Sequence, residues 1–486
     1  MRQFPHPLML FAFLSIPATM APAADQASGA LSVSPDVVKL PDTPAGKRFA
    51  AWLAAFNSGD RDALASIVAS FANTPAPPVD GLLGLRQRTG GFDLRKVEES
   101  SDTKIVVLLR QREGEQFARV VMEVDPTSEH RIVSAPIRAI PTPPEFAIPR
   151  LADADLATQL DAELKRLEAS DTFSGAVLIV KGGQTVFGRA YGFADRAQQL
   201  RNGMNTKFRI ASMGKMFTAT AVMQLVQAGK ISLSDPLSKY LPDYPNKDVA
   251  TKVTIEHLLT HTGGTGDIFT SEFAAHAAKI KTLADYVKLL GQTVLRFEPG
   301  ARYEYSNYGY VLLGRVIEVA SGQDYYAYLQ RHIFDPAGMT STGFWLESEP
   351  LNGRVIGYDP GQNGLAMVQG VPTDRASPAG GATSTAGDML RFSRALMAHK
   401  LLDATHADQL LTGRVQMGPN MKYALGFGDV GRGTPGHHVG HNGGAPGQNA
   451  DLQIYPEAGY VVIVLSNFSP PSAQRVSDFI GNRLSI

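Results

Sequence analysis

Hydrophobic residues follow two different periodicities in the first third of the chain. The stretch "AGKRFAAWLAAFNSGDRDALASIVASFA" has helical spacing and predicts two helices, separated at Gly59-Asp60. Three strand-like runs follow, each bounded by polar turn residues: "TKIVVLLRQ", "FARVVMEVD" and "RIVSAPIRAI". Because the helices come first and the strands later, residues 45–140 are predicted to form a small α+β domain.

A second pattern begins at Leu151. An amphipathic helix, "LADADLATQLDAELKRLEAS", precedes a hairpin, "GAVLIVKGGQTVFGRAYGFA", whose turn falls at Gly182-Gly183. The middle is helical and rich in loops; a second hairpin, "NADLQIYPEAGYVVIVLSN", turns at residues 456–459 before a helix over 473–484. Strands at both ends of a domain are expected to join in one sheet. Residues 151–486 are therefore predicted to be an α/β domain with an antiparallel sheet flanked by helices.

A Pro-rich segment, "PTPPEFAIPR" (141–150), separates the two patterns. Pro-rich linkers are extended and semi-rigid, so we place the domain boundary there. The length of 486 residues agrees with two domains, because a chain of this size is too long for one ordinary core.

The first residues have the pattern of a secretory signal. Arg2 precedes the apolar run "LMLFAFLSI" (8–16), and the small-residue stretch "ATMAPAA" ends at Ala24. This pattern indicates a signal peptide over residues 1–24, with an apolar core too short to span a bilayer. We therefore expect a periplasmic or secreted protein without a stable membrane span. A disordered or membrane-anchoring N-terminus is the alternative interpretation.

Charge and cysteine content exclude several classes of protein. The 46 basic and 46 acidic residues cancel, and no basic run of the kind found in nucleic-acid binders occurs, so no nucleic-acid partner is expected. The chain has no cysteine, which excludes disulfides, a lipid-modified cysteine and thiol chemistry.

The segment "RIASMGKMFT" (209–218) is the first candidate for chemistry. Ser212 stands at the start of a helix that has no charged residue from Met216 to Gly229, which predicts a buried central helix. Lys215 falls in its first turn, where burial and the positive helix end should lower the pKa of the amine. An amine made less basic in this way can accept a proton from Ser212, one turn away. The spacing thus indicates a nucleophile and its base.

The Ser-x-x-Lys spacing is weak evidence taken alone. Ser101 and Lys104 have the same spacing in the first domain, and a plain helix cap with a surface lysine would also fit. His257 and His261 have i, i+4 spacing but lack the glutamate of a zinc-protease motif, so no metal site is predicted. No G-x-S-x-G sequence occurs, which argues against an α/β-hydrolase triad.

Two further motifs, in order along the chain, establish a family resemblance. "FEPGARYEYSN" contains Tyr305-Ser306-Asn307, and "VGHNGGAPGQ" contains His441-Asn442-Gly443. A second Tyr-x-Asn, at Tyr244, lacks the flanking phrase. Ser-x-x-Lys, Tyr-x-Asn and Lys/His-x-Gly are signatures of penicillin-recognising serine enzymes. Residues 151–486 resemble the class C β-lactamase-related branch of that superfamily, near family VIII esterases and D-peptidases.

This resemblance implies a role for each motif residue. Tyr305 would share proton transfer with Lys215, and either group could be the base because their titrations are coupled. A Lys215 cation could lower the pKa of the Tyr305 phenol, which is the expected donor to the leaving group. Asn307 would donate to a substrate carbonyl and steady Lys215. A structural role, capping the local backbone, is the alternative for Asn307.

The Lys/His-x-Gly strand would form the other side of the site. The expected oxyanion donors are the backbone N–H groups of Ser212 and Gly444, and Gly443 and Gly444 would let substrate approach the strand closely. The β-lactamase branch usually carries lysine where this chain has His441, which would be charged only part of the time at neutral pH. Efficient β-lactam hydrolysis is therefore not expected. The alternative for His441 is a structural strand histidine.

The N-terminal domain carries a looser resemblance. The phrase around "WLAAFNSGD" and the order of elements over residues 45–140 are similar to an NTF2-like cone. Such a domain could house a ligand, mediate a dimer or serve only as a spacer or docking module.

Together these features predict an exported serine hydrolase. Ser212 would form an acyl-enzyme on an ester, amide or lactam carbonyl, with no metal or organic cofactor. The expected substrate is a small molecule or peptide, of esterase or D-amino-acid peptidase type, with weak β-lactamase activity as a further option. The competing interpretation is a penicillin-binding sensor or a non-catalytic ligand-binding protein with the same fold.

Overall fold

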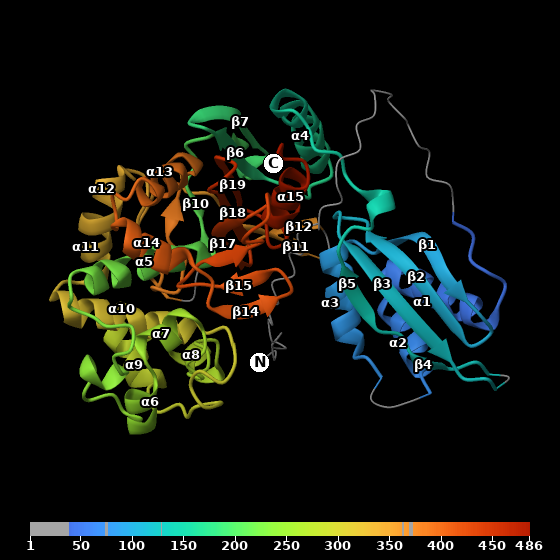
Figure 1. Cartoon of the computed structure of the whole chain (residues 1–486), viewed down its shortest axis with the longest axis horizontal. Coiled ribbons are helices and arrows are strands. Elements are labelled where there is room, and N and C mark those ends of the chain that lie inside the picture. Colours follow the sequence, from blue (N-terminus) through green and yellow to red (C-terminus); the bar gives the residue numbers. More distant parts are fainter. Residues whose placement is uncertain (1–37, 73–75, 128, 362–363, 369–372) are drawn as a thin grey trace. The chain divides into compact units, whose positions relative to one another are not determined.

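The computed structural model describes residues 38–72, 76–127, 129–361, 364–368 and 373–486 (Figure 1). The chain divides into two compact units, of which one ends at Arg150 and the other begins at Leu151. We call them the N-terminal unit and the C-terminal unit and describe each by itself.

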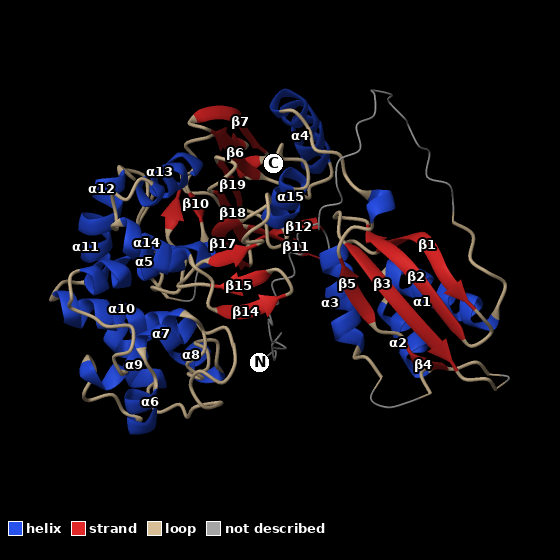
Figure 2. Cartoon of the chain, viewed as in Figure 1, coloured by secondary structure: helices blue, strands red, loops and turns tan. Residues whose placement is uncertain are grey.

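The N-terminal unit is α+β, with helices packed on one face of a sheet (Figure 2). The sheet has the order β1-β2-β3-β4, and β5 also pairs with β3. Sequence patterns did not predict α3 or β1, and they merged β4 and β5 into one run. The elements are α1 (Pro44–Ser58), α2 (Arg61–Ala69), α3 (Val79–Thr89), β1 (Phe92–Ser100), β2 (Lys104–Gln111), β3 (Phe117–Val124), β4 (Ile132–Ser134) and β5 (Ile137–Ile140).

Aromatic side chains form the centre of this unit. Trp52 of α1 stacks on Phe49 and Phe56, and Phe56 in turn stacks on Phe92 at the start of β1. These rings are almost fully buried. Each large aromatic ring removes much apolar surface from water, so the row joins α1 to the sheet and accounts for the helical pattern around Trp52.

An antiparallel sheet of order β14-β15-β16-β17-β18-β19-β6-β7 forms the centre of the C-terminal unit. Both predicted hairpins are present, and β19 pairs with β6, so the first and last strands of the unit are neighbours as expected. The α/β prediction is confirmed. The strands of this sheet are β6 (Gly175–Lys181), β7 (Gln184–Tyr191), β14 (Val415–Gly418), β15 (Met421–Tyr423), β16 (Gly428–Val430), β17 (His438–Ala445), β18 (Gln448–Tyr455) and β19 (Tyr460–Ser466).

Short strand pairs lie outside this sheet. β10 pairs with β13, β8 with β9, and β11 with β12. Their bounds are β8 (Phe193–Asp195), β9 (Leu200–Arg201), β10 (Phe208–Arg209), β11 (Tyr358–Gly361), β12 (Gly364–Met367) and β13 (Thr383–Ser384).

Helices cover both faces of the large sheet. Along β6, Val177 and Ile179 belong to one apolar cluster and Ala176, Leu178 and Val180 to another, because successive side chains of a strand point to opposite faces. Helices α4 (Asp153–Ala169) and α15 (Ser472–Gly481) pack on the first face. The second face supports the larger cluster, which contains the apolar side chains of α5 (Gly214–Gln227).

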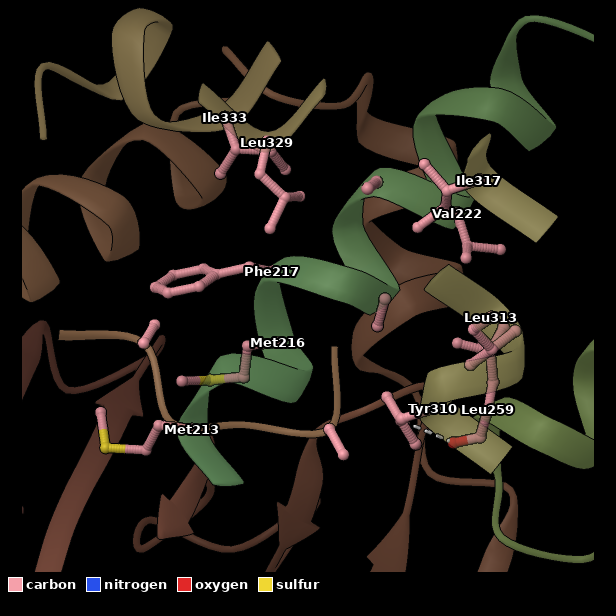
Figure 3. Packing of buried hydrophobic residues seen from close by; sticks show 14 of the residues in the cluster. Met213, Met216, Phe217, Val222, Leu259, Tyr310, Leu313, Ile317, Leu329 and Ile333 are labelled. Carbon is pink, nitrogen blue, oxygen red and sulfur yellow. Dashed lines mark hydrogen bonds between the residues drawn. The ribbon is translucent and has the colours of Figure 1, made fainter. Parts of the chain in front are cut away.

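The central helix α5 is enclosed by other helices (Figure 3). Phe217 lies beside Leu329 and Ile333, and Val222 lies beside Ile317 of α10 (Asn307–Ser321). The other helices are α6 (Lys247–Lys252), α7 (Ile255–Leu259), α8 (Ser271–His276), α9 (Leu283–Leu290), α11 (Tyr325–Leu329), α12 (Asp335–Ala337), α13 (Ala386–Met397) and α14 (Ala404–Leu411). A helix that is apolar all round is buried in this way, as predicted.

Within the described residues, no helix combines the length and the apolar character needed to cross a bilayer. The expected signal peptide, residues 1–24, lies outside the described residues.

Candidate active site

Ser212 lies on a strained turn just before the central helix. The alternative interpretation of Ser212 as a plain N-cap is wrong: Ser212 lies in a short 3-10 turn, η2 (Ala211–Met213), and α5 begins at Gly214 without a side-chain cap. Ala211 has a φ of 43°, a left-handed conformation that costs a non-glycine residue of order 1–3 kcal/mol. The Ser212 hydroxyl is hydrogen-bonded by Lys215 instead of capping the helix.

Two glycine-containing segments from elsewhere in the chain hold this turn in place. A Cβ at Gly443 of β17 would lie 2.3 Å from Ile210 O and 2.8 Å from Ser212 N. A Cβ at Gly380 would lie 2.5 Å from Ala211 O, and Gly381 N donates to that same carbonyl at 2.9 Å. Only residues without a side chain allow the three backbones to pack this closely.

The role predicted for Gly443 and Gly444 is wrong. Sequence reasoning assigned both glycines to close approach of substrate. In the structure, the space beside Gly443 is filled by the Ser212 turn, and a Cβ at Gly444 would lie 2.4 Å from Pro470 Cγ. Both glycines make room for the protein's own atoms, and Gly443 thereby sets the distance between β17 and Ser212.

Lys215 is completely buried and has three oxygen partners. Its Nζ atom lies 3.2 Å from Ser212 Oγ, 2.8 Å from Asn307 Oδ1 and 2.5 Å from Ala379 O. Burial lowers the pKa of Lys215 to about 7, while the charge of Asp267 acts in the opposite direction. The expected fall in the pKa of Lys215 is confirmed.

The partners of Lys215 determine how its neutral form is oriented. Ala379 O and Asn307 Oδ1 can only accept hydrogen bonds, so they take both hydrogens of a neutral amine. The lone pair then faces the third partner, Ser212 Oγ. At pH values near 7 this arrangement places an amine able to accept a proton against a hydroxyl.

Tyr305 also faces the Ser212 hydroxyl, and its phenol is a much weaker acid than the Lys215 ammonium group. Burial raises the pKa of Tyr305 well above its ordinary value, and the hydrogen bond with Ser212 lowers it only in part. The expectation that Lys215 lowers the pKa of this phenol is therefore wrong, because loss of hydration dominates. The Lys215 Nζ atom lies 4.6 Å from the centre of the Tyr305 ring.

Asn307 begins α10 and links Lys215 to a residue that sequence reasoning missed. Its Oδ1 accepts from Lys215, and its Nδ2 lies 3.2 and 3.1 Å from the two carboxylate oxygens of Asp267. The expected steadying of Lys215 is present. The amide hydrogens, which were expected to face a substrate carbonyl, face Asp267 instead. Asp267 is the last residue of the Gly-rich segment "HTGGTGD" (261–267), whose sequence offers no signal for such a contact.

His441 lies on β17 and is nearly fully buried. Its Nε2 lies 3.0 Å from Tyr423 Oη, and its Nδ1 bonds with Asn442 O. Burial, followed by the nearby Lys215 charge, lowers the pKa of His441 to about 3. This lowering argues against the partly charged His441 expected from the sequence, and the structural role weighed for this residue fits its surroundings.

The look-alike motifs have ordinary structural roles. Lys104 forms an exposed ion pair with Glu99, and the Tyr244 hydroxyl pairs with that of Tyr308. His257 is part of the cap of α7, and His261 bonds to Tyr423. Across the described part of the chain, no three His, Cys, Asp or Glu side chains gather as metal ligands would.

Comparison with known proteins shows the family of this chain. The sequence matches the family described as Beta-lactamase over residues 160–484, more than half of the chain. The chain belongs to the β-lactamase family. Penicillin-binding protein 4* of Bacillus subtilis (strain 168) is 31% identical over 320 residues, which cover 61% of this chain and 68% of that protein.

Two solved structures similar to this chain agree with this assignment. A penicillin-binding protein from Bacillus halodurans is 33% identical with a TM-score of 0.59, covering 65% of this chain and 97% of that one. A D-stereospecific amidohydrolase from Streptomyces sp. is 26% identical with a TM-score of 0.54, covering 65% and 97%. Family and neighbours together support a serine hydrolase.

Proposed function

We propose that this β-lactamase-family protein is an exported serine hydrolase that acts through an acyl-enzyme on an ester, amide or lactam carbonyl. Ser212 is the nucleophile, Lys215 the general base and Tyr305 the general acid. The observation that carries the proposal is the set of three partners around Lys215 Nζ, which aims its lone pair at Ser212 Oγ. The expected signal peptide supports export.

The first half-reaction follows from these roles. Ser212 Oγ bonds to the substrate carbonyl carbon while its proton passes to Lys215 Nζ. The carbonyl oxygen becomes an oxyanion, for which the backbone N–H groups of Ser212 and Gly444 are the proposed donors. Among the described residues, Ser212 N has no acceptor of its own. The bond to the leaving group then breaks, and that group takes the Tyr305 proton, which Lys215 restores.

The second half-reaction uses water as the nucleophile. Lys215, neutral again, takes a proton from water as the water oxygen attacks the acyl carbon. The ester bond to Ser212 breaks, Ser212 Oγ takes the proton from Lys215, and the acid product leaves. The raised pKa of Tyr305 suits a group that stays protonated until it donates, which supports Lys215 over Tyr305 as the base.

The test compares the purified protein with a Ser212→Ala variant on three probes. These are a short-chain nitrophenyl ester, a chromogenic cephalosporin and a fluorescent penicillin. The expected result is ester turnover that the substitution abolishes, with weak cephalosporin turnover. A stable penicillin adduct without turnover of any probe would instead identify a penicillin-binding sensor. Turnover that persists in the variant would contradict the role of Ser212.

The N-terminal unit is proposed to be an NTF2-like domain over residues 45–140, joined through the Pro-rich segment 141–150. Its order of helices and strands and the apolar faces of α1 and the sheet support this assignment. It could house a ligand or mediate a dimer, and the dimer is tested by comparing the mass of the full chain in solution with that of one copy.

A further inference from the structure

One phenol joins two imidazoles behind the proposed active site. Tyr423 ends β15 and is completely buried. Its hydroxyl oxygen lies 3.0 Å from His261 Nε2 and 3.0 Å from His441 Nε2. His261 follows α7, whereas His441 lies on β17, so a single hydroxyl links three separate segments.

The proton positions in this group are fixed independently from its two ends. Ser306 N–H donates to His261 Nδ1 at 3.1 Å, so the ring hydrogen of neutral His261 is on Nε2 and points at Tyr423. The carbonyl of Asn442 can only accept, so His441 carries its hydrogen on Nδ1 and accepts at Nε2. Tyr423 must therefore accept from His261 and donate to His441. The two ends agree, and each of the four contacts joins one donor to one acceptor.

An added proton on His441 would break this order. With Nε2 protonated, His441 can no longer accept from Tyr423, and the Tyr423 hydrogen has to turn to Tyr310, the other phenol within hydrogen-bond reach. Burial and the Lys215 charge lower the pKa of both histidines, that of His261 well below its ordinary value. The titratable groups that face this cluster are Lys215, Tyr303, Tyr305 and Tyr310.

Both ends of the group support residues of the proposed site. His261 holds the backbone of Ser306, which lies between Tyr305 and Asn307. His441 is two residues from Gly443 on β17, so both point to the same side of the strand, where Gly443 packs on the Ser212 turn. A displacement of the Tyr423 hydroxyl would thus affect both the segment that contains Tyr305 and the strand β17 beside Ser212.

We propose that Tyr423 is a positioning residue that keeps His261 and His441 neutral in one proton order, so that His441 supports the strand beside Ser212 and cannot serve as a cationic ligand for a substrate carboxylate. The consequence, which rests on the proposed hydrolase function, concerns substrate class. The preferred acyl substrates have an uncharged leaving group, as in neutral esters and primary amides, and lack a carboxylate beside the scissile bond.

The first test is independent of substrate. Nitrogen-15 NMR of the imidazoles in the full chain is expected to show His441 as the Nδ1–H tautomer and His261 as the Nε2–H tautomer, both neutral from pH 5 to pH 8. The Tyr423→Phe variant keeps the ring and removes only the hydroxyl. We expect His441 to lose its single tautomer there and to gain a proton between pH 5 and 7. A His441 that titrates near pH 6.5 in the unmodified protein would overturn the proposal.

The second test uses two matched esters, 3-acetoxybenzamide and 3-acetoxybenzoate, which differ only in the charge on the leaving group. The unmodified protein is expected to favour the amide-bearing ester at least about tenfold in kcat/KM, with a ratio constant between pH 5 and 8. In Tyr423→Phe, kcat/KM for that ester should fall about tenfold, the size of one lost hydrogen bond, and the ratio should move toward the acid below pH 7.

Tyr460→Phe is the matched control. Tyr460 is equally buried, its hydroxyl bonds to Asp153, and it lies on β19 in the apolar cluster on the other face of the sheet. It should keep both the ester ratio and the pH profile. Equal turnover of the two esters by the unmodified protein, or identical behaviour of the two variants, would refute the proposal. Turnover of neither ester would contradict the hydrolase function, and the NMR result would still decide the role of Tyr423.

Discussion

Lys215 Nζ lies 3.2 Å from Ser212 Oγ, across the junction between the turn η2 and the central helix α5. Both residues are held from outside their own helix. The loop that contains Gly380 and the strand that contains Gly443 pack on the Ser212 turn, and Ala379 O fixes the amine. The pairing of hydroxyl and amine therefore depends on two distant segments and not on helical spacing alone.

Substitution of Lys215 by methionine should abolish most of the activity. Methionine keeps an unbranched apolar stem but cannot accept the Ser212 proton, and loss of a general base typically reduces kcat by about 10²–10⁴-fold. The measurement is turnover of a nitrophenyl ester, with circular dichroism to confirm the fold. Lys104→Met serves as the control because Lys104 has the same spacing from Ser101 yet forms an exposed ion pair with Glu99. Activity that survives in Lys215→Met would exclude Lys215 as the base.

The rate should depend on pH through the ionisation of Lys215. Burial lowers the pKa of this amine to about 7, and only the neutral amine can accept a proton. kcat/KM should therefore rise as pH increases through about 7 and reach a plateau above it. Because burial raises the pKa of Tyr305, no fall from its ionisation is expected between pH 7 and 9. A rate that falls across this range would contradict the assignment of base and acid.

Asp267→Asn tests the residue that sequence reasoning missed. The charge of Asp267 raises the pKa of Lys215, so its removal should shift the acid side of the kcat/KM profile to lower pH. The substitution also weakens the hold on Asn307 Nδ2, and loss of a hydrogen bond to a charged group corresponds to about a 10–100-fold decrease in kcat. Asp403→Asn is the control: Asp403 caps α14, and its replacement should leave the profile in place. If the pH dependence of kcat/KM were unchanged in Asp267→Asn, Asp267 would not influence the ionisation of Lys215.

Burial of Lys215 should also make folding stability depend on pH. The amine has a pKa of about 7 when folded and about 10.5 when unfolded, so between these values the unfolded chain binds more protons. Stability should then rise with pH across this window, by at most about 1.4 kcal/mol per pH unit from this group. The measurement is the free energy of unfolding in urea at pH 7 and at pH 9.5, for Lys215→Met and for the unmodified protein. Relative to the unmodified protein, Lys215→Met should be more stable at pH 7 than at pH 9.5. A difference that stays constant with pH would contradict the lowered pKa.

Much of the fold of the C-terminal unit could be predicted from local pattern. The hairpins at Gly182-Gly183 and at residues 456–459 have strong turn signals, and the absence of charge after Lys215 identifies a buried helix. In the N-terminal unit, β1 was missed because its residues are mostly polar and mostly exposed, so it carries little apolar alternation. Pairing with β2 determines this strand, and such pairing is not visible in a local sequence.

Of the candidate site, only the residues that belong to recognisable sequence motifs could be predicted. The structure brings together four residues of the predicted motifs: Ser212, Lys215, Tyr305 and Asn307. They could be predicted because each belongs to a recognisable sequence motif. The contributions of Asp267 and Ala379 O depend on how two loops fold onto α5, and a backbone carbonyl has no sequence signature at all. The sequence predicted a partly charged His441 because it gives no sign that this side chain is buried beside Tyr423. That burial depends on the tertiary structure.

Gly443→Ala should impair both stability and activity. The added Cβ would lie 2.3 Å from Ile210 O and 2.8 Å from Ser212 N, and these are backbone atoms that cannot move aside without shifting the nucleophile. Overpacking of this kind typically costs about 1–3 kcal/mol, and the displaced Ser212 should lose more activity than the loss of stability alone would explain. Urea unfolding and ester turnover measure the two effects.

Gly418→Ala is the matched control for this prediction. Gly418 also lies in a strand of the large sheet, but a Cβ there would meet no atom within 4 Å. Alanine should therefore be tolerated at 418, with turnover and unfolding midpoint close to those of the unmodified protein. If Gly443→Ala behaved like Gly418→Ala, the contact between β17 and the Ser212 turn would not be what positions the nucleophile.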